Sequence, residues 1–588
     1  MIGYYLENSS TFGVSGLIKT NFLMRKISPV LITFCILSIN FVISQKRNNP
    51  KLILQITVDQ LRGDLPFRIK DRWVDGGFKY LMQNGIWYDN AHHPHANNET
   101  IVGHVTLSTG TYPSIHGMIG NAWFDGTKNR LVYNIEDNRY DATGGVGARD
   151  TDSEVDNSQV SHSEGRSPHN ILTTTISDEI KATFGVNSKI YAVSGKDRGA
   201  VSMAGHTGKA FWYSTKNGNF TSSTFYFQSF PEWVNNWNRH EEANLVSNKS
   251  WKLLNEIGTY QYGAADDRPY ENPADLGYGR TFPHPFGDAD GKYFYTLLTT
   301  SPIVDELTIS FTKELIENVG IGKDNTPDYL SVSLASTDYV GHLFGPNSLE
   351  TEDNLLRLDR TLANLFDYVD DQIGLENTII VLSADHGAPE SAQSLQEKGF
   401  KVGIMNTDQI DLKTMDQRLH QKFGIGKEVI KEVFTPYVYL DKDLIAENNL
   451  NLAEVSKVIA EEYAKTIGVA HAFTMIDLAV GNLPDNLLTR KVLYNYHPKR
   501  SGDIYLIFEA NWGITFDGDV ALVNHGSPWR YDSHVPLIFA GHGIKGLLVS
   551  REVSTVDAAI TLCKYLEIGE PSGATGLPLT EIFKRFKK

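Results

Sequence analysis

Short apolar runs separated by amphipathic segments are the main pattern along the chain. The clearest run is Leu52–Val58, interrupted only by Gln55 and Thr57, and similar runs span residues 329–334 and 378–382. Runs of this kind are typical of parallel strands buried on both faces. Between the last two runs, apolar residues recur at helical spacing: Leu355, Leu358, Leu362, Leu365, Phe366 and Val369. The alternation predicts an α/β fold, with a doubly wound, mainly parallel sheet and helices on both faces.

Further segments extend the pattern, and two regions depart from it. We predict a helix over residues 171–184, a strand at 188–193 and a final strand at 535–539. Residues from about 205 to 300 are rich in aromatic residues, Asn, Gly and Pro, and residues from about 400 to 520 form a second excursion with a helical segment. We interpret both as insertions, with cap or subdomain structure, in one domain of residues 46–588. Aromatic residues of the first region either wall the site or, more commonly for such stripes, belong to the core: Phe211, Trp212 and Trp233.

Residues 1–44 predict an export signal. Met24-Arg25-Lys26 precedes an apolar run over residues 27–43, and Ser44 is a small residue at the expected cleavage position. Residues 1–23 are interpreted as an upstream extension of that signal. The alternative is an uncleaved anchor, but the run is interrupted and short for a span of about 20 residues. We therefore expect a periplasmic or secreted protein with no stable membrane partner after cleavage.

Charge and cysteine content narrow the function classes. The chain has 54 Lys and Arg against 70 Asp and Glu, a formal net charge of −16. An acidic protein is a poor general binder of nucleic acid, because phosphate backbones are held by an excess of Lys and Arg. The two cysteines are Cys35, in the expected signal, and Cys563. This excludes a disulfide framework and a cysteine-based zinc site. The sequence leaves the oligomeric state open.

Acidic residues follow three of the predicted strands. Asp59 comes directly after the first, and Asp338 and Asp385 follow the runs at 329–334 and 378–382. Carboxyl ends of parallel strands meet at the crevice where open α/β sheets bind ligands. Histidines accompany these carboxylates: His342, the adjacent His386, and His525 before the last strand. Three carboxylates and three imidazoles suit two zinc ions, since zinc accepts nitrogen and oxygen donors.

Other motifs make the pattern specific to a family. The set comprises Val58-Asp59, Thr100-x-x-Gly103-His104, Thr109-Gly110, His116-Gly117-x-x-Gly120-Asn121, Ser194-Gly-Lys196-Asp-Arg198, Asp338-x-x-x-His342, Ala384-Asp385-His386-Gly387 and His525-Gly526. In order and spacing this set resembles the alkaline phosphatase superfamily, and closely the PafA-type periplasmic alkaline phosphatases with a threonine nucleophile. Type I phosphodiesterases and nucleotide pyrophosphatases are related to it. The resemblance covers nearly all of residues 50–545.

The resemblance implies a role for each motif residue. One zinc, holding the nucleophile, would be bound by Asp59, Asp385 and His386; the other, holding the leaving group, by Asp338, His342 and His525. Thr100 resembles the nucleophile that forms a phosphothreonine intermediate, and the non-bridging phosphate oxygens would contact Asn121, Lys196 and Arg198. His534 is the alternative to His525 as the last ligand, although the His-Gly-Ser context favours His525. His104 and His116 are interpreted as supporting structure.

The expected function is that of a metal-dependent alkaline phosphatase, a phosphoric monoester hydrolase acting on small-molecule phosphate monoesters. Two cations on the phosphate, Lys196 and Arg198, favour a monoester dianion over a diester, which has one fewer charged oxygen. A phosphodiesterase or nucleotide pyrophosphatase of the same superfamily is the alternative. A secreted protein that binds phosphate or metal without turnover is an alternative from another class. The sequence does not identify the physiological substrate.

Overall fold

The computed structural model describes residues 48–145, 160–263, 266–271, 277–406, 412–515 and 523–583. The chain divides into a unit of residues 1–48 and a unit of residues 49–588, and the description below concerns the second. The predicted export signal and Cys35 lie outside the described residues. In the described part of the chain, no helix combines the length and apolar character needed to cross a membrane.

A large sheet forms the centre of the 49–588 unit. Its strand order is β19-β2-β18-β11-β1-β10-β5-β6-β7, and β20 pairs with β2. The strands are β1 (Leu52–Val58), β2 (Ile86–His92), β5 (Ile190–Ser194), β6 (Lys209–Tyr213), β7 (Phe220–Thr221), β10 (Asp328–Leu334), β11 (Thr378–Ser383), β18 (His534–Gly541), β19 (Leu547–Val549) and β20 (Val553–Ser554). The five strands from β11 to β6 are parallel, whereas β18 pairs antiparallel with both β11 and β2. The predicted mainly parallel α/β sheet is confirmed.

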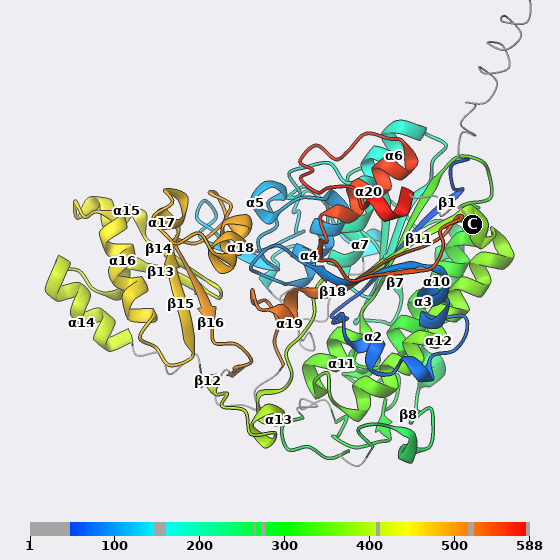
Figure 1. The fold of residues 1–588 in the computed structure, drawn as a ribbon, viewed down its shortest axis with the longest axis horizontal. Helices are drawn as coiled ribbons and strands as arrows, with labels where there is room; N and C mark the ends of the chain where they lie inside the picture. The colour runs from blue at the N-terminus through cyan, green and yellow to red at the C-terminus, as the bar shows by residue number, and fades with distance from the viewer. Residues whose placement is uncertain are drawn as a thin grey trace, which may run out of the picture. The chain divides into compact units, whose positions relative to one another are not determined.

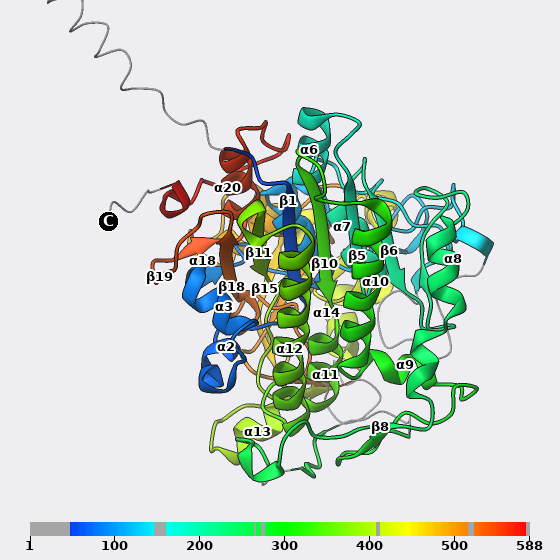
Figure 2. The same ribbon diagram turned by 90° about the vertical axis from the view of Figure 1, so that its right-hand side faces the viewer.

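Helices cover both faces of this sheet. Leu54 and Ile56 of β1 pack in one apolar cluster with residues of α3 (Phe78–Asn84), α10 (Ile303–Val319) and α12 (Leu349–Gln372). Ile53 packs on the opposite face, in a cluster with α6 (Ile176–Phe184) and α20 (Asp557–Leu566). Successive side chains of a strand point to opposite faces, so a run that is apolar throughout buries both. Figure 2 shows α10 and α12 lying across the face of β1, β10 and β5.

Two predicted elements differ from the structure in detail. The helix predicted over 171–184 begins only at Ile176, because Thr175 caps it: its hydroxyl accepts the N–H of Asp178, whose side chain in turn accepts the N–H of Thr175. This capping box ends the preceding loop sharply. The helix predicted from the spacing of Leu355 to Val369 is the longer α12, which starts after Ser348, whose hydroxyl accepts the N–H of Thr351.

The second predicted insertion contains a separate sheet. Its order is β13-β14-β16-β15, antiparallel throughout: β13 (Ile430–Phe434), β14 (Tyr437–Leu440), β15 (Val469–Thr474) and β16 (Ile504–Phe508). Three helices share an apolar core with it: α14 (Leu412–Phe423), α15 (Lys442–Glu447) and α16 (Leu452–Tyr463). Figure 1 shows this sheet and its helices as a lobe beside the main sheet of the same unit.

The first predicted insertion starts with β6, an inner strand of the main sheet, and continues with α8 (Glu232–Arg239) and the short pair β8 (Ser250–Trp251) and β9 (His284–Pro285). Phe211 and Trp212 lie in β6 and are buried, and Trp233 packs against the same core as Phe211. These aromatic side chains therefore belong to the core, which is the second of the two alternatives that the sequence left open.

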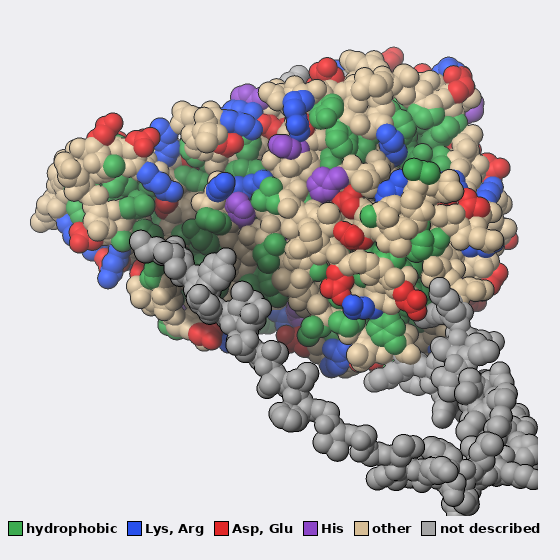
Figure 3. Space-filling view, turned by 90° about the horizontal axis from the view of Figure 1, so that it is seen from above, with side chains coloured by type: hydrophobic (Ala, Val, Ile, Leu, Met, Phe, Trp, Pro, Cys, Tyr) green, Lys and Arg blue, Asp and Glu red, His purple; other side chains and the backbone are tan. Residues whose placement is uncertain are grey.

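The remaining elements connect these layers. They are α2 (Leu65–Arg68), α4 (Thr100–Thr109), α5 (Pro113–His116), β3 (Ala122–Asp125), β4 (Arg130–Tyr133), α7 (Asp197–Ala204), α9 (Phe294–Thr299), α11 (Ser336–Phe344), α13 (Ala392–Glu397), β12 (Ile404–Asn406), α17 (Met475–Ala479), α18 (Leu487–Asn495), β17 (Gly513–Thr515) and α19 (Arg530–Ser533). On the face seen in Figure 3, acidic and basic side chains are scattered among one another rather than gathered into one large basic patch.

Candidate active site with two metal-binding groups

The carboxyl ends of four neighbouring parallel strands place most of the candidate residues. Asp59 follows β1, Lys196 follows β5, Asp338 lies in the first turn of the helix after β10, and Asp385 follows β11. These four strands are adjacent in the sheet. Residues far apart in the sequence therefore meet at one edge of the sheet, as expected for ligand sites in open α/β folds.

Thr100 is the first residue of α4 and is buried, at 1% exposure. Its hydroxyl accepts a hydrogen bond from Arg198 Nη2 at 3.4 Å. Helix α4 packs closely on the loop that carries Asp385. This explains why position 103, three residues after Thr100, is a glycine: a Cβ on Gly103 would lie 1.9 Å from the carbonyl oxygen of Asp385. Glycine at this position allows the helix that carries Thr100 to lie directly against a candidate metal ligand.

The first metal-binding group is Asp59, Asp385 and His386, whose ligand atoms lie within 4.8 Å of one another. His386 Nε2 lies 3.4 Å from Asp59 Oδ1 and 3.7 Å from Asp385 Oδ2. All three atoms are buried; among the described residues, Asp59 Oδ1 and His386 Nε2 have no hydrogen-bond partner, and His104 Nδ1 lies 3.2 Å from Asp385 Oδ2. His386 Nδ1 is 3.0 Å from the carbonyl oxygen of Gly387, which leaves Nε2 as the ligand atom. Buried acceptor atoms that face one another fit a bound cation.

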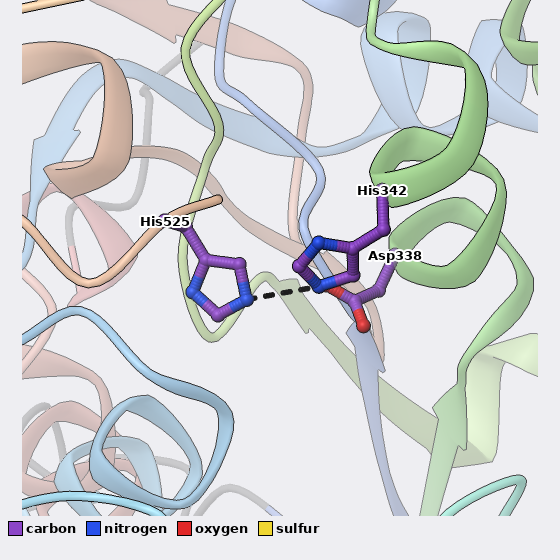
Figure 4. A group of neighbouring side chains, drawn as sticks. All are labelled: Asp338, His342 and His525. Atoms are coloured by element: carbon purple, nitrogen blue, oxygen red, sulfur yellow. Dashed lines mark ion pairs between the residues drawn. The ribbon is translucent and has the colours of Figure 1, made fainter. Parts of the chain in front are cut away.

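The second group is Asp338, His342 and His525 (Figure 4). The Nε2 atoms of the two histidines lie 3.3 Å and 3.5 Å from Asp338 Oδ1. Each histidine can donate its Nδ1–H to a carbonyl oxygen: His342 to Val523 at 2.7 Å and His525 to Asn98 at 2.8 Å. That arrangement holds both rings with Nε2 toward the carboxylate, as second-sphere hydrogen bonds do in metal sites.

The two groups adjoin. The rings of His386 and His525, one from each group, stack with centroids 3.6 Å apart and planes 17° from parallel. Burial raises the pKa of Asp59 well above its ordinary value, and the nearby Asp338 and Asp385 carboxylates raise it further. Burial also opposes ionisation of Asp338, but Lys196 and His342 hold its pKa well below the ordinary range. Three carboxylates in one buried volume repel one another, so the site favours cations.

Lys196 and Arg198 are both buried at the start of α7. Lys196 Nζ lies 2.8 Å from Asp59 Oδ2, also contacts Asp338, and stands 4.5 Å from the centre of the Tyr339 ring. Burial lowers the pKa of Lys196, but the two carboxylates outweigh that effect and raise it above its ordinary value. The lysine is therefore charged and sits between the two metal-binding groups.

Asn121 immediately precedes β3 and is held beside the start of α4. Its Oδ1 accepts the backbone N–H of Ile101 at 3.2 Å, and its own backbone N–H is donated to a carboxylate oxygen of Glu99. Burial raises the pKa of Glu99. The residue before Thr100 thus fixes the position of Asn121.

The two candidates for the last histidine ligand, His525 and His534, lie in different surroundings. His525 lies in the second metal-binding group, whereas His534 Nε2 is 2.8 Å from the carbonyl oxygen of Asp89, and its ring stacks on His92. His104, interpreted as supporting structure, lies with Nδ1 2.8 Å from the carbonyl oxygen of Thr100 and 3.2 Å from Asp385 Oδ2. His116 is buried farther along the same region, 3.3 Å from Thr106 Oγ1.

Two residues of the site, Gln60 and Glu99, belong to none of the sequence motifs described above. Gln60 donates from its side-chain amide to Asp338 Oδ1 at 2.7 Å and from its backbone to Asp385 Oδ1 at 3.1 Å. It also has a positive φ of 64°, which is uncommon for a residue other than glycine. Its position directly after Asp59 is the only sequence feature that marks it. Glu99 is similarly marked only by preceding Thr100.

Comparison with known proteins places the chain among phosphate-ester hydrolases. Residues 53–528 match the family model described as type I phosphodiesterase / nucleotide pyrophosphatase. The chain is 35% identical over 550 residues to alkaline phosphatase PafA of Elizabethkingia meningoseptica, covering 92% of this chain and 96% of that protein. It is 34% identical over 545 residues to alkaline phosphatase PhoV of Synechococcus elongatus, covering 92% and 94%.

Solved structures also match this chain over most of its length. The crystal structure of wild-type alkaline phosphatase PafA superposes with a TM-score of 0.81 at 34% identity, covering 91% of this chain and 99% of that one. A second structure of that enzyme, with the same TM-score of 0.81, carries substitutions of one Thr, one Asn, one Lys and one Arg. In that variant the Thr and Asn are 21 positions apart and the Lys and Arg two positions apart. Thr100 and Asn121, and Lys196 and Arg198, have the same separations.

Proposed function

The chain belongs to the type I phosphodiesterase / nucleotide pyrophosphatase family and hydrolyses phosphate monoesters, and we propose that it does so through Thr100 at a site for two zinc ions. The observation that carries this proposal is the position of Thr100. Its buried hydroxyl is in contact with Arg198, on a helix packed against Asp385 of one metal-binding group. Two such groups adjoin at this point.

Thr100 is the proposed nucleophile. A threonine hydroxyl is weakly nucleophilic at its ordinary pKa and must be activated. Two divalent ions, when bound, stabilise the attacking and the departing oxygens of an in-line displacement. Thr100 attacks the phosphorus, the alcohol departs, and a phosphothreonine forms that water then hydrolyses to inorganic phosphate. The position of Thr100 at the start of α4 also favours binding of the negatively charged phosphoryl group, because unpaired N–H groups at a helix N-terminus favour negative charge.

The ligands proposed for the two ions are the residues of the two groups. Asp59, Asp385 and His386 would hold one ion, and the other would be held by Asp338, His342 and His525. The donor set favours zinc over magnesium or calcium, because three of its six members are imidazoles, whereas the hard cations prefer oxygen donors alone.

Lys196, Arg198 and Asn121 are proposed to hold the non-bridging phosphate oxygens. The guanidinium of Arg198 already lies on Thr100, so it can orient the phosphoryl group at the nucleophile. Its planar fork suits two oxygens, and Lys196 supplies a compact charge between the metal-binding groups. The identically spaced residues substituted in the PafA variant support the importance of these four positions.

Phosphodiester hydrolysis is the second candidate, since the family model is named for it. The presence of both Lys196 and Arg198 favours the monoester, because a monoester dianion brings one more charged oxygen to be neutralised than a diester does. We propose that small-molecule phosphate monoesters are the main substrates.

We also propose that residues 46–588 act as one catalytic domain and that the protein is exported to the periplasm or secreted. The first proposal is supported by the meeting of Asp59 and His525, which lie near opposite ends of the sequence, in adjoining groups. The second is supported by the signal-like pattern of residues 1–44.

The test combines metal analysis, chelation and a nucleophile variant. The purified protein is expected to contain two zinc ions per chain and to lose aryl phosphate hydrolysis on chelation and regain it with zinc. Thr100→Ala should abolish hydrolysis, Thr100→Ser should retain part of it, and acid quenching during turnover should trap phosphate on the peptide containing Thr100. Thr127→Ala, at an exposed hydroxyl, is the control. Full activity in Thr100→Ala would overturn the proposed nucleophile, and metal or phosphate binding without turnover would favour a non-catalytic binding protein.

A further inference from the structure

A cavity of about 800 Å³ lies outside the candidate active site, between α18, the segment around α19 and the residues preceding the C-terminal 3₁₀ turn at Thr580–Phe583. We call it the Lys491 cavity. None of the candidate ligand, nucleophile or phosphate-binding residues lines it. Its volume lies within the range of about 300–1,000 Å³ typical of small-molecule sites.

Most of its lining is apolar. The wall comes from parts of the chain that are distant in sequence: residues 92–94, Leu488 and Tyr494 of α18, Trp529, and Val553 and Leu579. Val553 and Leu579 are buried, and Trp529 donates its ring N–H to the carbonyl oxygen of Phe508, which fixes the indole. The cavity thus offers apolar surface for the body of a ligand.

One side of the cavity is cationic. Lys491 is 6% exposed, and its ammonium donates to the carbonyl oxygen of Pro528 at 2.8 Å. An ammonium carries three donor hydrogens, so this single acceptor leaves capacity for a ligand. Arg530 contacts two neutral groups, His92 Nε2 at 3.0 Å and Asn90 Oδ1 at 2.9 Å. In the described part of the chain, neither Lys491 nor Arg530 has a carboxylate within ion-pair distance.

The other charged groups of the lining form ion pairs or hydrogen bonds within the protein, or lie at the rim of the cavity. Arg490 pairs with Asp485 at 2.7 Å, and Arg551 pairs with Glu581 through two contacts of 2.8 Å. The carboxylate of Asp557 accepts the backbone N–H groups of Ser554 and Leu577. Glu552 is exposed at the rim. Burial lowers the pKa of Lys491 to about 8, while Asp532 and Glu552 oppose that effect.

A buried ammonium is costly unless an anion or several acceptors compensate it. Here two cations without a carboxylate partner lie at a cavity whose lining is apolar over most of its area. We propose that the Lys491 cavity binds a small organic anion with an apolar body, its oxyanion head on Lys491 and Arg530 and its body against Leu488, Trp529 and Leu579. A medium-chain carboxylate is the chemistry that this arrangement fits.

Calorimetric titration of the zinc-loaded protein with dodecanoate tests the proposal, with dodecanol and acetate as ligands that lack the charge or the apolar body. Dodecanoate should bind with one site per chain, and dodecanol and acetate at least about tenfold more weakly. Lys491→Met keeps the apolar stem and removes the charge, and Arg530→Gln does the same at an exposed position. Each should weaken dodecanoate binding about tenfold or more, as expected for the loss of a charge-assisted hydrogen bond. Lys457→Met, at an exposed lysine of α16, is the matched control.

The thermal midpoint of each variant shows whether it folds, and if Lys491→Met does not, Arg530→Gln decides. Absence of dodecanoate binding by the wild-type protein would overturn the proposal. Equal binding of dodecanol, or unchanged affinity in both variants, would overturn the role of the two cations. Because dodecanoate is not a phosphate ester, these outcomes do not depend on phosphatase activity.

Discussion

His104 Nδ1 lies 3.2 Å from Asp385 Oδ2 and 2.8 Å from the carbonyl oxygen of Thr100. On the other side of the ring, Nε2 is 2.8 Å from the hydroxyl of Ser333, in the parallel strand next to β1. One buried imidazole thus connects the helix that starts at the proposed nucleophile with a proposed metal ligand. Residues that orient metal ligands in this way contribute to metal affinity although they do not touch the metal.

We therefore predict that His104→Ala weakens zinc binding about 10- to 100-fold, the range for loss of an outer-sphere partner. Competition with a chelator of known affinity measures this directly. Hydrolysis by the variant should recover in part at high zinc concentration, which a purely structural loss would not allow. His471→Ala, at an exposed histidine of β15, should leave zinc affinity unchanged. Wild-type zinc affinity in His104→Ala would contradict the prediction.

Glu99 is predicted to act as a positioning residue for Asn121, whose backbone N–H it accepts. Glu99→Ala leaves that N–H without its partner, and we expect kcat/KM for an aryl phosphate to fall about 10- to 100-fold, in line with the cost of an unpaired buried donor. Glu99→Gln keeps an acceptor oxygen and should lose much less.

A double-mutant cycle separates positioning from general destabilisation. If Glu99 acts through Asn121, then Glu99→Ala should cost little more once Asn121→Ala is present. Fully additive losses in the double variant would mean that Glu99 acts by another route.

Lys196 and Arg198 are predicted to determine the preference for monoesters. Lys196→Ala with Arg198→Ala should reduce kcat/KM for an aryl phosphate monoester about 100-fold or more, because two charge-assisted contacts are lost. A matched aryl phosphodiester should lose less, since it brings fewer charged oxygens. The ratio of the two rates is the measurement, and Lys216→Ala, at an exposed lysine after β6, is the control. Equal losses on both substrates would contradict this account of specificity.

The sequence predicts the centre of the fold well, because β1, β10 and β11 are buried on both faces and therefore read as continuous apolar runs. Asp59 and Asp385 follow directly from these strands, and sheet geometry brings them together. The antiparallel direction of β18 has no such signal, since an apolar run is the same in either direction. Contacts such as Glu99 with Asn121 depend on how loops approach each other, which hydrophobic periodicity does not encode.

The Lys491 cavity is even harder to predict from hydrophobic periodicity. Lys491 lies in the amphipathic helix α18, where a lysine is usually a solvated surface residue. Lys491 is nevertheless buried, its ammonium donates to the carbonyl oxygen of Pro528, and Trp529 and Val553, much farther along the chain, line the same cavity. Single residues of this kind are found only when the tertiary contacts are known.

Asp305 is predicted to make stability depend on pH. This buried carboxylate of α10 accepts the backbone N–H groups of Ala335 and Ser336 at 2.7 Å and 3.0 Å, at the start of the helix that carries Asp338. Burial raises its pKa from the ordinary 3.8 to about 7, although those two donors oppose the shift. The folded protein therefore binds this proton more tightly than the unfolded chain, so the carboxyl lowers stability progressively as pH rises from about 4 to 7.

Asp305→Asn keeps the acceptor oxygen and removes the titration. Its free energy of unfolding, relative to wild type, should therefore rise between pH 5 and pH 7, by at most about 2.7 kcal/mol because one proton contributes about 1.36 kcal/mol per pH unit, and should change little from pH 7 to 8. Denaturant unfolding of both zinc-loaded proteins at each pH measures the difference. Asp324→Asn removes an exposed carboxyl whose pKa is lowered by its hydrogen bond to Lys189, so its effect should not change over this range. A difference between Asp305→Asn and wild type that is flat from pH 5 to 8 would show that Asp305 is ionised throughout, held by the two backbone donors at the start of α11.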